Sequence, residues 1–167
     1  MSRMSDLAID LRIEYPSLPS EDQLSQALHL AAMGWPVFPC RGKVPMTSHG
    51  FKDGTLDPEQ IRAWWTSKPL ATIGVALPVG TMAVDVDDVD DFAAAALPLP
   101  EGPGQATPSG GYHRLLNIGE RAAKQTQGHF PGADTRVGGK GYVIAWEPWQ
   151  WRTVDALPPA PDWALAR

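Results

Sequence analysis

Residues 82–87 read Met82-Ala83-Val84-Asp85-Val86-Asp87, and this stretch decides the architecture. From Val84 onward, apolar and acidic residues alternate with the period of a β-strand that has one buried face. Successive side chains of a strand point to opposite faces, so Asp85 and Asp87 share one face while Val84 and Val86 share the other. The pattern predicts a strand that packs its valines into a core and projects two carboxylates.

Two carboxylates on one face of a rigid strand can share divalent metal ions. A half-buried strand with a solvated acidic face explains the same residues, because Asp-x-Asp is short and common. Glycosyltransferases, phosphatases and nucleases all use such a pair. The motif alone therefore leaves both a structural and a catalytic interpretation open.

Helices and strands are expected on both sides of this strand. A capping box at 20–23, with Ser20 as N-cap, predicts a helix that ends at Gly34. Asp57 followed by Pro58 predicts the start of a second helix. Further elements are expected as strands at 37–40, 72–77, 105–109, 111–116, 142–146 and 151–154, a helix at 88–97, and a polar loop at 41–53. This mixture predicts an α+β fold.

The amino-acid composition excludes several classes of protein. The chain has 167 residues, of which 43% are hydrophobic, which suits one domain with a buried core. A single cysteine, Cys40, excludes an internal disulfide framework and a Cys-based zinc cluster, and we expect it to be a small core residue. The net charge of −5 argues against binding nucleic acid through bulk charge. No signal peptide or membrane segment is predicted, so we expect a soluble cytoplasmic protein.

A second feature with chemical potential is Thr107-Pro108-Ser109-Gly110-Gly111-Tyr112-His113. The glycines let the backbone approach a ligand closely and present N–H groups to an anion. His113 lies on the face opposite Tyr112 and can donate a hydrogen bond to a phosphate oxygen. A glycine hairpin with a surface histidine is the plainer alternative.

A third feature lies at residues 132–143, which contain Asp134, Arg136 and Lys140. In an extended chain Asp134 and Arg136 face together, which places a metal-type ligand beside a phosphate-type ligand. A charged pair before a hairpin turn is the alternative. Segment 84–101 holds six acidic residues and no Lys or Arg, whereas 110–141 holds five such cations and two acids. An acidic cluster facing a basic wall suits a metal–triphosphate substrate.

The ordered set Asp85-x-Asp87, Ser109-Gly110-Gly111-Tyr112-His113 and Asp134 resembles the three motifs of the archaeo-eukaryotic primase superfamily. It is most similar to the primase-polymerase (prim-pol) domain at the N-terminus of phage and plasmid replication proteins. Segments 34–39, 43–45, 57–65 and 139–143 are also similar to that family. The resemblance implies a primase-polymerase fold, in which an N-terminal α/β unit packs on an RNA-recognition-motif-like unit with a mixed or antiparallel sheet. The active cleft is expected between the two units.

The same resemblance implies the extent of the domain and its partners. We expect residues 1–19 to form an N-terminal tail or short helix, and 20–167 to form the catalytic domain of a larger replication protein. The implied partners are a single-stranded DNA template, nucleoside triphosphates and a fused or associated replicative helicase. The chain itself carries no Walker A motif.

The implied activity is template-directed nucleotidyl transfer, with DNA primase and polymerase activity that depends on Mg²⁺ or Mn²⁺. By position, Asp85, Asp87 and Asp134 would hold two ions, one activating the attacking 3′-hydroxyl and one steadying the pyrophosphate. The expected nucleotide-binding residues are Ser109, Gly110, His113, Arg136 and Lys140, the last two being our own assignment as phosphate contacts. Two other functions stay open: a non-catalytic module that binds single-stranded DNA or an origin, and a metal-dependent phosphodiesterase.

Overall fold

The computed structural model of the protein describes residues 22–167, so the expected N-terminal tail lies outside the described residues. Its helices are α2 (Gln23–Ala32), α3 (Pro58–Ser67) and α4 (Val89–Ala95). Its strands are β1 (Val37–Arg41), β2 (Val44–Pro45), β3 (Thr72–Ala76), β4 (Thr81–Val86), β5 (Gly104–Ala106), β6 (Tyr112–Asn117), β7 (Thr126–Phe130), β8 (Ala133–Val137) and β9 (Tyr142–Ile144). None of the described helices has the length and apolar character needed to cross a membrane.

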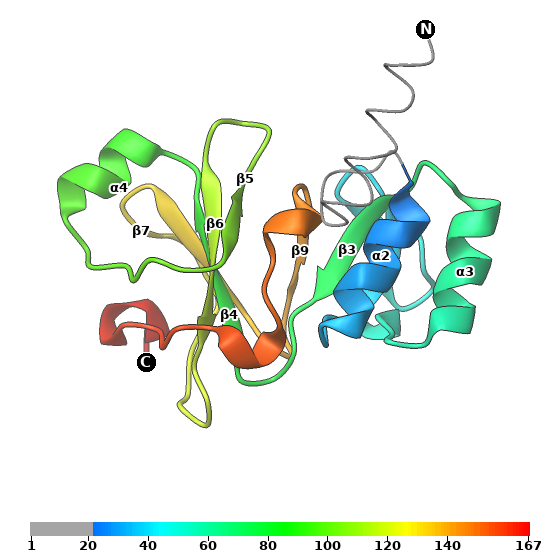
Figure 1. Ribbon diagram of the computed structural model, residues 1–167. Helices are drawn as coiled ribbons and strands as arrows, with labels where there is room; N and C mark the ends of the chain where they lie inside the picture. Colours follow the sequence, from blue (N-terminus) through cyan, green and yellow to red (C-terminus); the bar gives the residue numbers. More distant parts are fainter. Residues whose placement is uncertain (1–21) are drawn as a thin grey trace, which may run out of the picture.

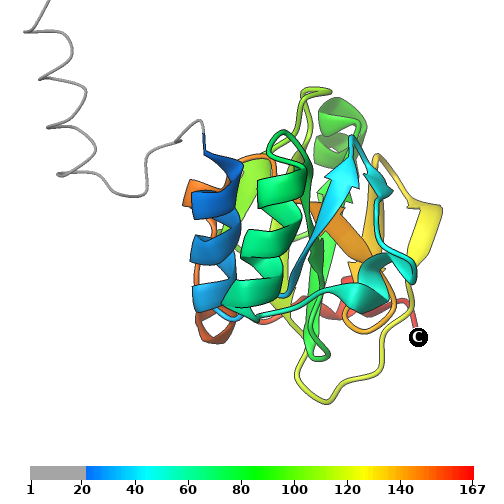
Figure 2. The same cartoon turned by 90° about the vertical axis from the view of Figure 1, so that its right-hand side faces the viewer.

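The strands form two antiparallel sheets, which Figure 1 shows side by side. The first sheet has the order β2-β1-β3-β9, and α2 and α3 lie next to each other against one of its faces (Figure 2). Leu30 from α2, together with Ile61 and Trp65 from α3, is almost completely buried between helices and sheet. This first unit is the expected N-terminal α/β part, and the α+β class is confirmed.

Local capping decides where the two large helices begin. Asp57 caps α3 as predicted, since its Oδ1 accepts a hydrogen bond from Glu59 N at 3.0 Å. The prediction for α2 is wrong in register: Asp22 is the N-cap, and its carboxylate accepts from Leu24 N at 3.0 Å. An Asp carboxylate at this position satisfies an amide of the first turn, so the helix starts at Gln23. Ser20 itself lies outside the described residues.

The second sheet has the order β5-β6-β4-β8-β7, so the acidic strand β4 lies at its centre. Val84 and Val86 are fully buried on the face covered by α4 and the end of the chain. Phe92 from α4 and Leu165 near the C-terminus complete that core. The alternation in 84–87 therefore has the predicted physical meaning, with valines inward and carboxylates on the other face.

The opposite face of the second sheet changes character along its strands. Ala83 and Leu115 are register partners on β4 and β6, and both pack into the core of the first unit. Two residues further along the same strands lie Asp85 and His113, which are also partners. The apolar end of this face therefore packs against the first unit. The polar end, with Asp85 and His113, lies beside this contact.

The C-terminal segment crosses from one unit to the other. Figure 1 shows this segment, drawn orange to red, running from β9 toward the second sheet. Trp151 and Leu157 are buried in the core of the first unit, whereas Ala164 and Leu165 are buried in the core of the second. Residues 148–165 therefore contribute to both cores.

Several predicted elements differ from those observed. Residues 151–154 do not form a strand; Val154 begins a short 3₁₀ turn, and its N–H donates to Met33 O at 3.1 Å. The predicted loop 41–53 contains β2 and a 3₁₀ turn at Gly50–Asp53. Strands β7 and β8 were not predicted as strands. β7 is a largely exposed edge strand that includes Gly128, so it lacks the apolar alternation that marks a strand.

Candidate active site

Three neighbouring strands bring the expected metal-site residues into one row. On β4, Asp85 is paired with His113 of β6 on one side and with Asp134 of β8 on the other. Residues directly opposite each other in an antiparallel pair have Cβ atoms about 5 Å apart. The carboxyl-bearing positions 85 and 134, far apart in the sequence, are therefore adjacent in the sheet.

The end of β4 is fixed by a turn that only glycine can occupy. Gly132 O accepts hydrogen bonds from Asp87 N at 2.9 Å and Asp88 N at 3.2 Å. Gly132 has φ +68°, and a Cβ there would collide with the backbone of Asp88 and would lie 2.8 Å from Phe92 N. This turn holds Asp87, one residue past the strand, at the edge of the site.

The glycine pair of the second motif brings its loop against the same strand end. Gly110 adopts a left-handed conformation at φ +92°, and its N–H donates to Thr107 O at 3.1 Å. A Cβ on Gly111 would overlap the carbonyl oxygen of Val86. The loop therefore packs closely on β4, and the N–H of Gly110 is engaged in the turn.

A cleft of about 440 Å³ opens where the two units meet. The second sheet and its loops contribute the polar side of the lining, namely Asp85, Asp87, Ser109, His113, Arg136 and Lys140. The first unit contributes residues including Lys43, Phe51, Tyr142, Ile144 and Trp146. Of the expected site residues, Gly110 and Asp134 do not line this cleft. Asp134 is the register partner of Asp85 on β8, and its Oδ1 accepts a hydrogen bond from Gly128 N at 2.7 Å.

The two carboxylates of β4 differ in electrostatic environment. Burial on its own raises the pKa of Asp85, but the hydrogen bond from His113, aided by the Arg136 charge, holds that pKa below its usual value. The pKa of Asp87 is raised by partial burial and by the negative charges of Asp85 and Asp134. At Asp87, burial and the neighbouring carboxylates therefore outweigh the favourable contribution of His113.

Fewer basic side chains of residues 110–141 line the cleft than the sequence suggested. Of the five Lys and Arg residues at 110–141, Arg136 and Lys140 line the cleft. Arg114 and Arg121 instead donate to backbone carbonyl groups elsewhere, and Lys124 is outside the lining. A count of charges along the chain therefore overestimated the basic wall, because strand alternation and local contacts decide where each side chain points.

An aromatic wall faces these charged residues across the cleft. The rings of Phe51 and Tyr142 are stacked, with centroids 6.0 Å apart and planes inclined by 25°. The Tyr142 hydroxyl donates to Lys43 O at 2.8 Å, and burial raises the pKa of Tyr142, so the hydroxyl stays a donor. No pattern in the sequence indicated this wall. Flat apolar rings suit a base or sugar rather than a phosphate.

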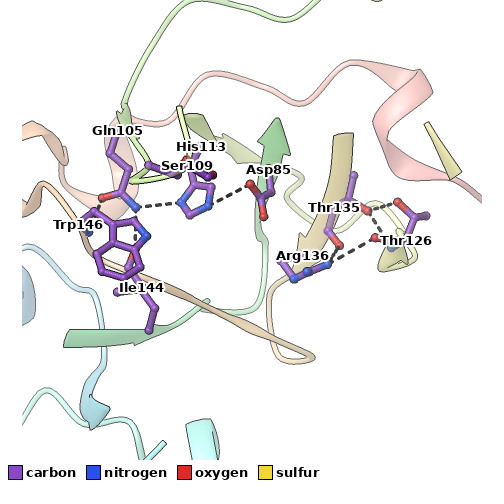
Figure 3. A network of polar contacts seen from close by, with 10 residues as sticks. Asp85, Gln105, Ser109, His113, Thr126, Thr135, Arg136, Ile144 and Trp146 are labelled. Carbon is purple, nitrogen blue, oxygen red and sulfur yellow. Dashed lines mark hydrogen bonds and ion pairs between the residues drawn. The ribbon is translucent and has the colours of Figure 1, made fainter. Parts of the chain in front are cut away.

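His113 is buried rather than a surface histidine. Its side chain is 7% exposed, and its Nε2 lies 3.3 Å from Asp85 Oδ1. Its Nδ1 lies 2.9 Å from Nε2 of Gln105, which is its register partner on β5 (Figure 3). Gln105 was not among the site residues predicted from the sequence. No local pattern identifies it, because the burial and hydrogen bonds of Gln105 depend on residues 144–151.

The carboxylates of Asp85, Asp87 and Asp134 are chemically suited to a hard divalent cation, because Mg²⁺ and Mn²⁺ prefer oxygen ligands. The raised pKa of Asp87 agrees with this fit, since a cation would offset the repulsion among the neighbouring carboxylates. Within residues 22–167, however, no three His, Cys, Asp or Glu side chains are already gathered closely enough to hold an ion. The donor set is present, and its side chains would close on an ion only when it binds.

Cys40 should be chemically inert in the folded protein. It is completely buried beside Phe38 and Ile144, and burial raises the pKa of its thiol to about 12. Because the thiolate is the reactive form, Ellman's reagent should leave the native protein unmodified at mildly alkaline pH. After unfolding in guanidinium, one equivalent should react, since the chain has a single cysteine. Rapid modification of the native protein would contradict the assignment of Cys40 to the core.

Comparison with known proteins gives one family. The model of the family described as "Bifunctional DNA primase/polymerase, N-terminal" matches residues 27–163. This range contains every strand of both sheets and all the residues that line the cleft. No curated protein matches the chain.

Proposed function

Because the chain belongs to the bifunctional DNA primase/polymerase family, we propose that its cleft catalyses template-directed nucleotidyl transfer on single-stranded DNA. One observation carries this proposal: Asp85 and Asp87 line the same cleft as Arg136 and Lys140. Carboxylates suited to cations beside side chains suited to phosphates match the needs of a metal–triphosphate substrate.

The acidic side of the cleft would hold Mg²⁺ or Mn²⁺. Asp85 and Asp87 are the proposed principal ligands, and Asp134 would contribute the carboxylate oxygen that does not accept from Gly128 N. A bound divalent ion would lower the pKa of a 3′-hydroxyl and offset the charge that builds up on the pyrophosphate. Because β4 is central in its sheet, Asp85 is held by a rigid element on both sides.

The basic side would bind the triphosphate of the incoming nucleotide. Arg136 projects from β8 on the same face as Asp134, and its Nη1 makes only long contacts of 3.3 and 3.5 Å with backbone carbonyls. Lys140 donates to Ala123 O at 3.2 Å and keeps further N–H donors for a ligand. With Ser109 and the His113 ring, these side chains would orient the phosphates between the carboxylates and the aromatic wall.

The aromatic wall would take the rest of the nucleotide. Phe51 and Tyr142 come from the first unit, whereas the site carboxylates, Arg136 and Lys140 come from the second sheet and its loops. A nucleotide with its phosphates on the polar side would therefore place its sugar or base against the two rings. In this arrangement both units are needed for one substrate, which agrees with a cleft at their junction.

The proposal is tested by nucleotide incorporation on a defined single-stranded DNA. The protein should extend a labelled primer when template, nucleoside triphosphates and Mg²⁺ or Mn²⁺ are all present, and chelation by EDTA should stop the reaction. Parallel reactions without primer measure initiation, and parallel reactions with ribonucleotides or deoxyribonucleotides measure sugar preference.

The same assay separates the other two functions. Shortening of the labelled primer instead of extension would indicate a phosphodiesterase. Binding of single-stranded DNA with neither incorporation nor metal-dependent affinity for nucleotide would indicate a non-catalytic module. Either result would refute the polymerase proposal.

A further inference from the structure

The buried amide of Gln105 is held by contacts that fix its orientation. Its Oε1 lies at hydrogen-bond distance from three N–H donors: Trp146 N at 2.8 Å, Glu147 N at 3.0 Å and Trp151 Nε1 at 3.0 Å. A flipped amide would place its NH₂ group against all three donors, which is unfavourable in a side chain only 5% exposed. The oxygen and nitrogen of this amide are therefore assigned by their surroundings.

With the oxygen so placed, the NH₂ group faces two acceptors. One is Ile144 O at 2.6 Å, which can only accept. The other is His113 Nδ1 at 2.9 Å. Since the Gln105 nitrogen has no lone pair to offer, Nδ1 must be the unprotonated nitrogen of the neutral ring. The ring proton then resides on Nε2, which points toward Asp85 Oδ1 at 3.3 Å.

We propose that Gln105 is a positioning residue that locks His113 in the Nε2–H tautomer, so that its N–H is presented to the cleft. Figure 3 shows the chain of contacts from Trp146 through Gln105 and His113 to Asp85. The importance of that N–H for nucleotide binding rests on the proposed function, whereas the tautomer itself does not.

The orientation of Gln105 is set by contacts with another part of the chain. Gln105 lies on the edge strand β5, but its partners lie at 144–151, in β9 and the segment that follows it. A second contact, Ala106 N to Glu147 Oε1 at 2.6 Å, ties the same strand to that segment. The His113 ring is thus oriented by the Gln105 contact at its Nδ1 side, so the Asp85 carboxylate does not have to orient it.

Loss of the Gln105 donor would change whether His113 Nε2 carries the proton that it can donate to a ligand. Without a donor at Nδ1, the ring could carry its proton on either nitrogen. Whenever Nε2 was unprotonated, its lone pair would face the carboxylate of Asp85 and any phosphate oxygen in the cleft. A positioning residue of this kind typically affects ligand affinity or activity by about 10–100-fold.

The test uses Gln105→Glu, which keeps the shape and replaces the amide donor with acceptors. Gln60→Glu makes the same chemical change at an exposed position on α3 and is the matched control. Ring ¹⁵N chemical shifts of His113, recorded on the protein without nucleotide at neutral to mildly alkaline pH, report the tautomer directly. His113→Gln assigns the signal among the four histidines of the chain.

Wild type and Gln60→Glu should show a protonated Nε2 and an unprotonated Nδ1. Gln105→Glu should shift the proton toward Nδ1 and weaken binding of dATP with Mn²⁺, measured by calorimetry, by about 10–100-fold. A wild-type ring with its proton on Nδ1 would overturn the inference whether or not Gln105→Glu folds. An unchanged tautomer in folded Gln105→Glu, or a changed tautomer with unchanged dATP affinity, would also overturn it.

The two proposals fail in distinguishable ways. If the wild-type protein has the Nε2–H tautomer but neither binds dATP with metal nor extends a primer, the proposed function is wrong and the tautomer lock stands. If primers are extended while the ring carries its proton on Nδ1, the lock is wrong and the proposed function stands.

Discussion

Replacing Asp87 with alanine should lower metal-dependent nucleotide incorporation by more than about 100-fold, because even residues that merely support a metal ligand cost 10–100-fold when lost. The folded protein should be as stable as the wild type or slightly more stable. Partial burial and neighbouring negative charges raise the pKa of Asp87, so its ionised form at neutral pH is disfavoured in the folded state relative to the unfolded chain. Removing that carboxylate relieves repulsion and leaves the valine core of β4 untouched.

The matched control is Asp90→Ala, in the first turn of α4. Asp90 is exposed and belongs to the same acidic segment, but it does not line the cleft. The Asp90→Ala protein should incorporate nucleotides nearly as well as the wild type. This result would separate the effect of losing a negative charge from the effect of losing a site carboxylate. Thermal melting without nucleotide gives the stability of each variant. Normal incorporation by a folded Asp87→Ala protein would disprove the assigned role of the β4 carboxylates.

Gly111→Ala should be strongly destabilising and should also abolish incorporation. The added Cβ would overlap the carbonyl oxygen of Val86, a backbone atom that no rotamer change can move aside. Relief requires separating the start of β6 from the end of β4, beside the Val86–Tyr112 pair and one residue from the Asp85–His113 pair. We expect a loss of about 3 kcal/mol, the upper end of the range for overpacked sites, measured by denaturant unfolding.

Gly110→Ala is the control for this prediction. Gly110 has φ +92°, but open space surrounds the position of an added Cβ. Only the left-handed backbone disfavours alanine there, at a cost of about 1–2 kcal/mol. If Gly110→Ala lost as much stability as Gly111→Ala, close packing of the loop on β4 would not be the reason for the second glycine.

Sequence patterns predicted the parts of the site that depend on local interactions. The alternation at 84–87 predicted both the buried valines and the face of Asp85, because side-chain direction in a strand follows from position alone. The cap at Asp57 predicted α3 for a similar reason, since it depends on the first turn of the helix. Arg136 and Lys140 were selected by their place beside Asp134, and both line the cleft.

What the sequence could not predict depends on contacts between distant segments. Gln105 gains its role from partners 39 to 46 residues further along the chain. The Phe51–Tyr142 wall requires β9 to return beside β3, which no local pattern specifies. β8 has apolar and polar residues in alternation, but its partner β7 is polar and exposed, so the hairpin was not recognised as strands.

The segment at 148–165 has a consequence for how this domain is made. Each unit obtains part of its interior from that last stretch, through Trp151 and Leu157 in one and Ala164 and Leu165 in the other. During translation the earlier residues emerge from the ribosome with both hydrophobic cores incomplete, so neither unit can become fully native alone. Newly made chains therefore stay exposed to chaperones and proteases until nearly the whole domain has left the exit tunnel.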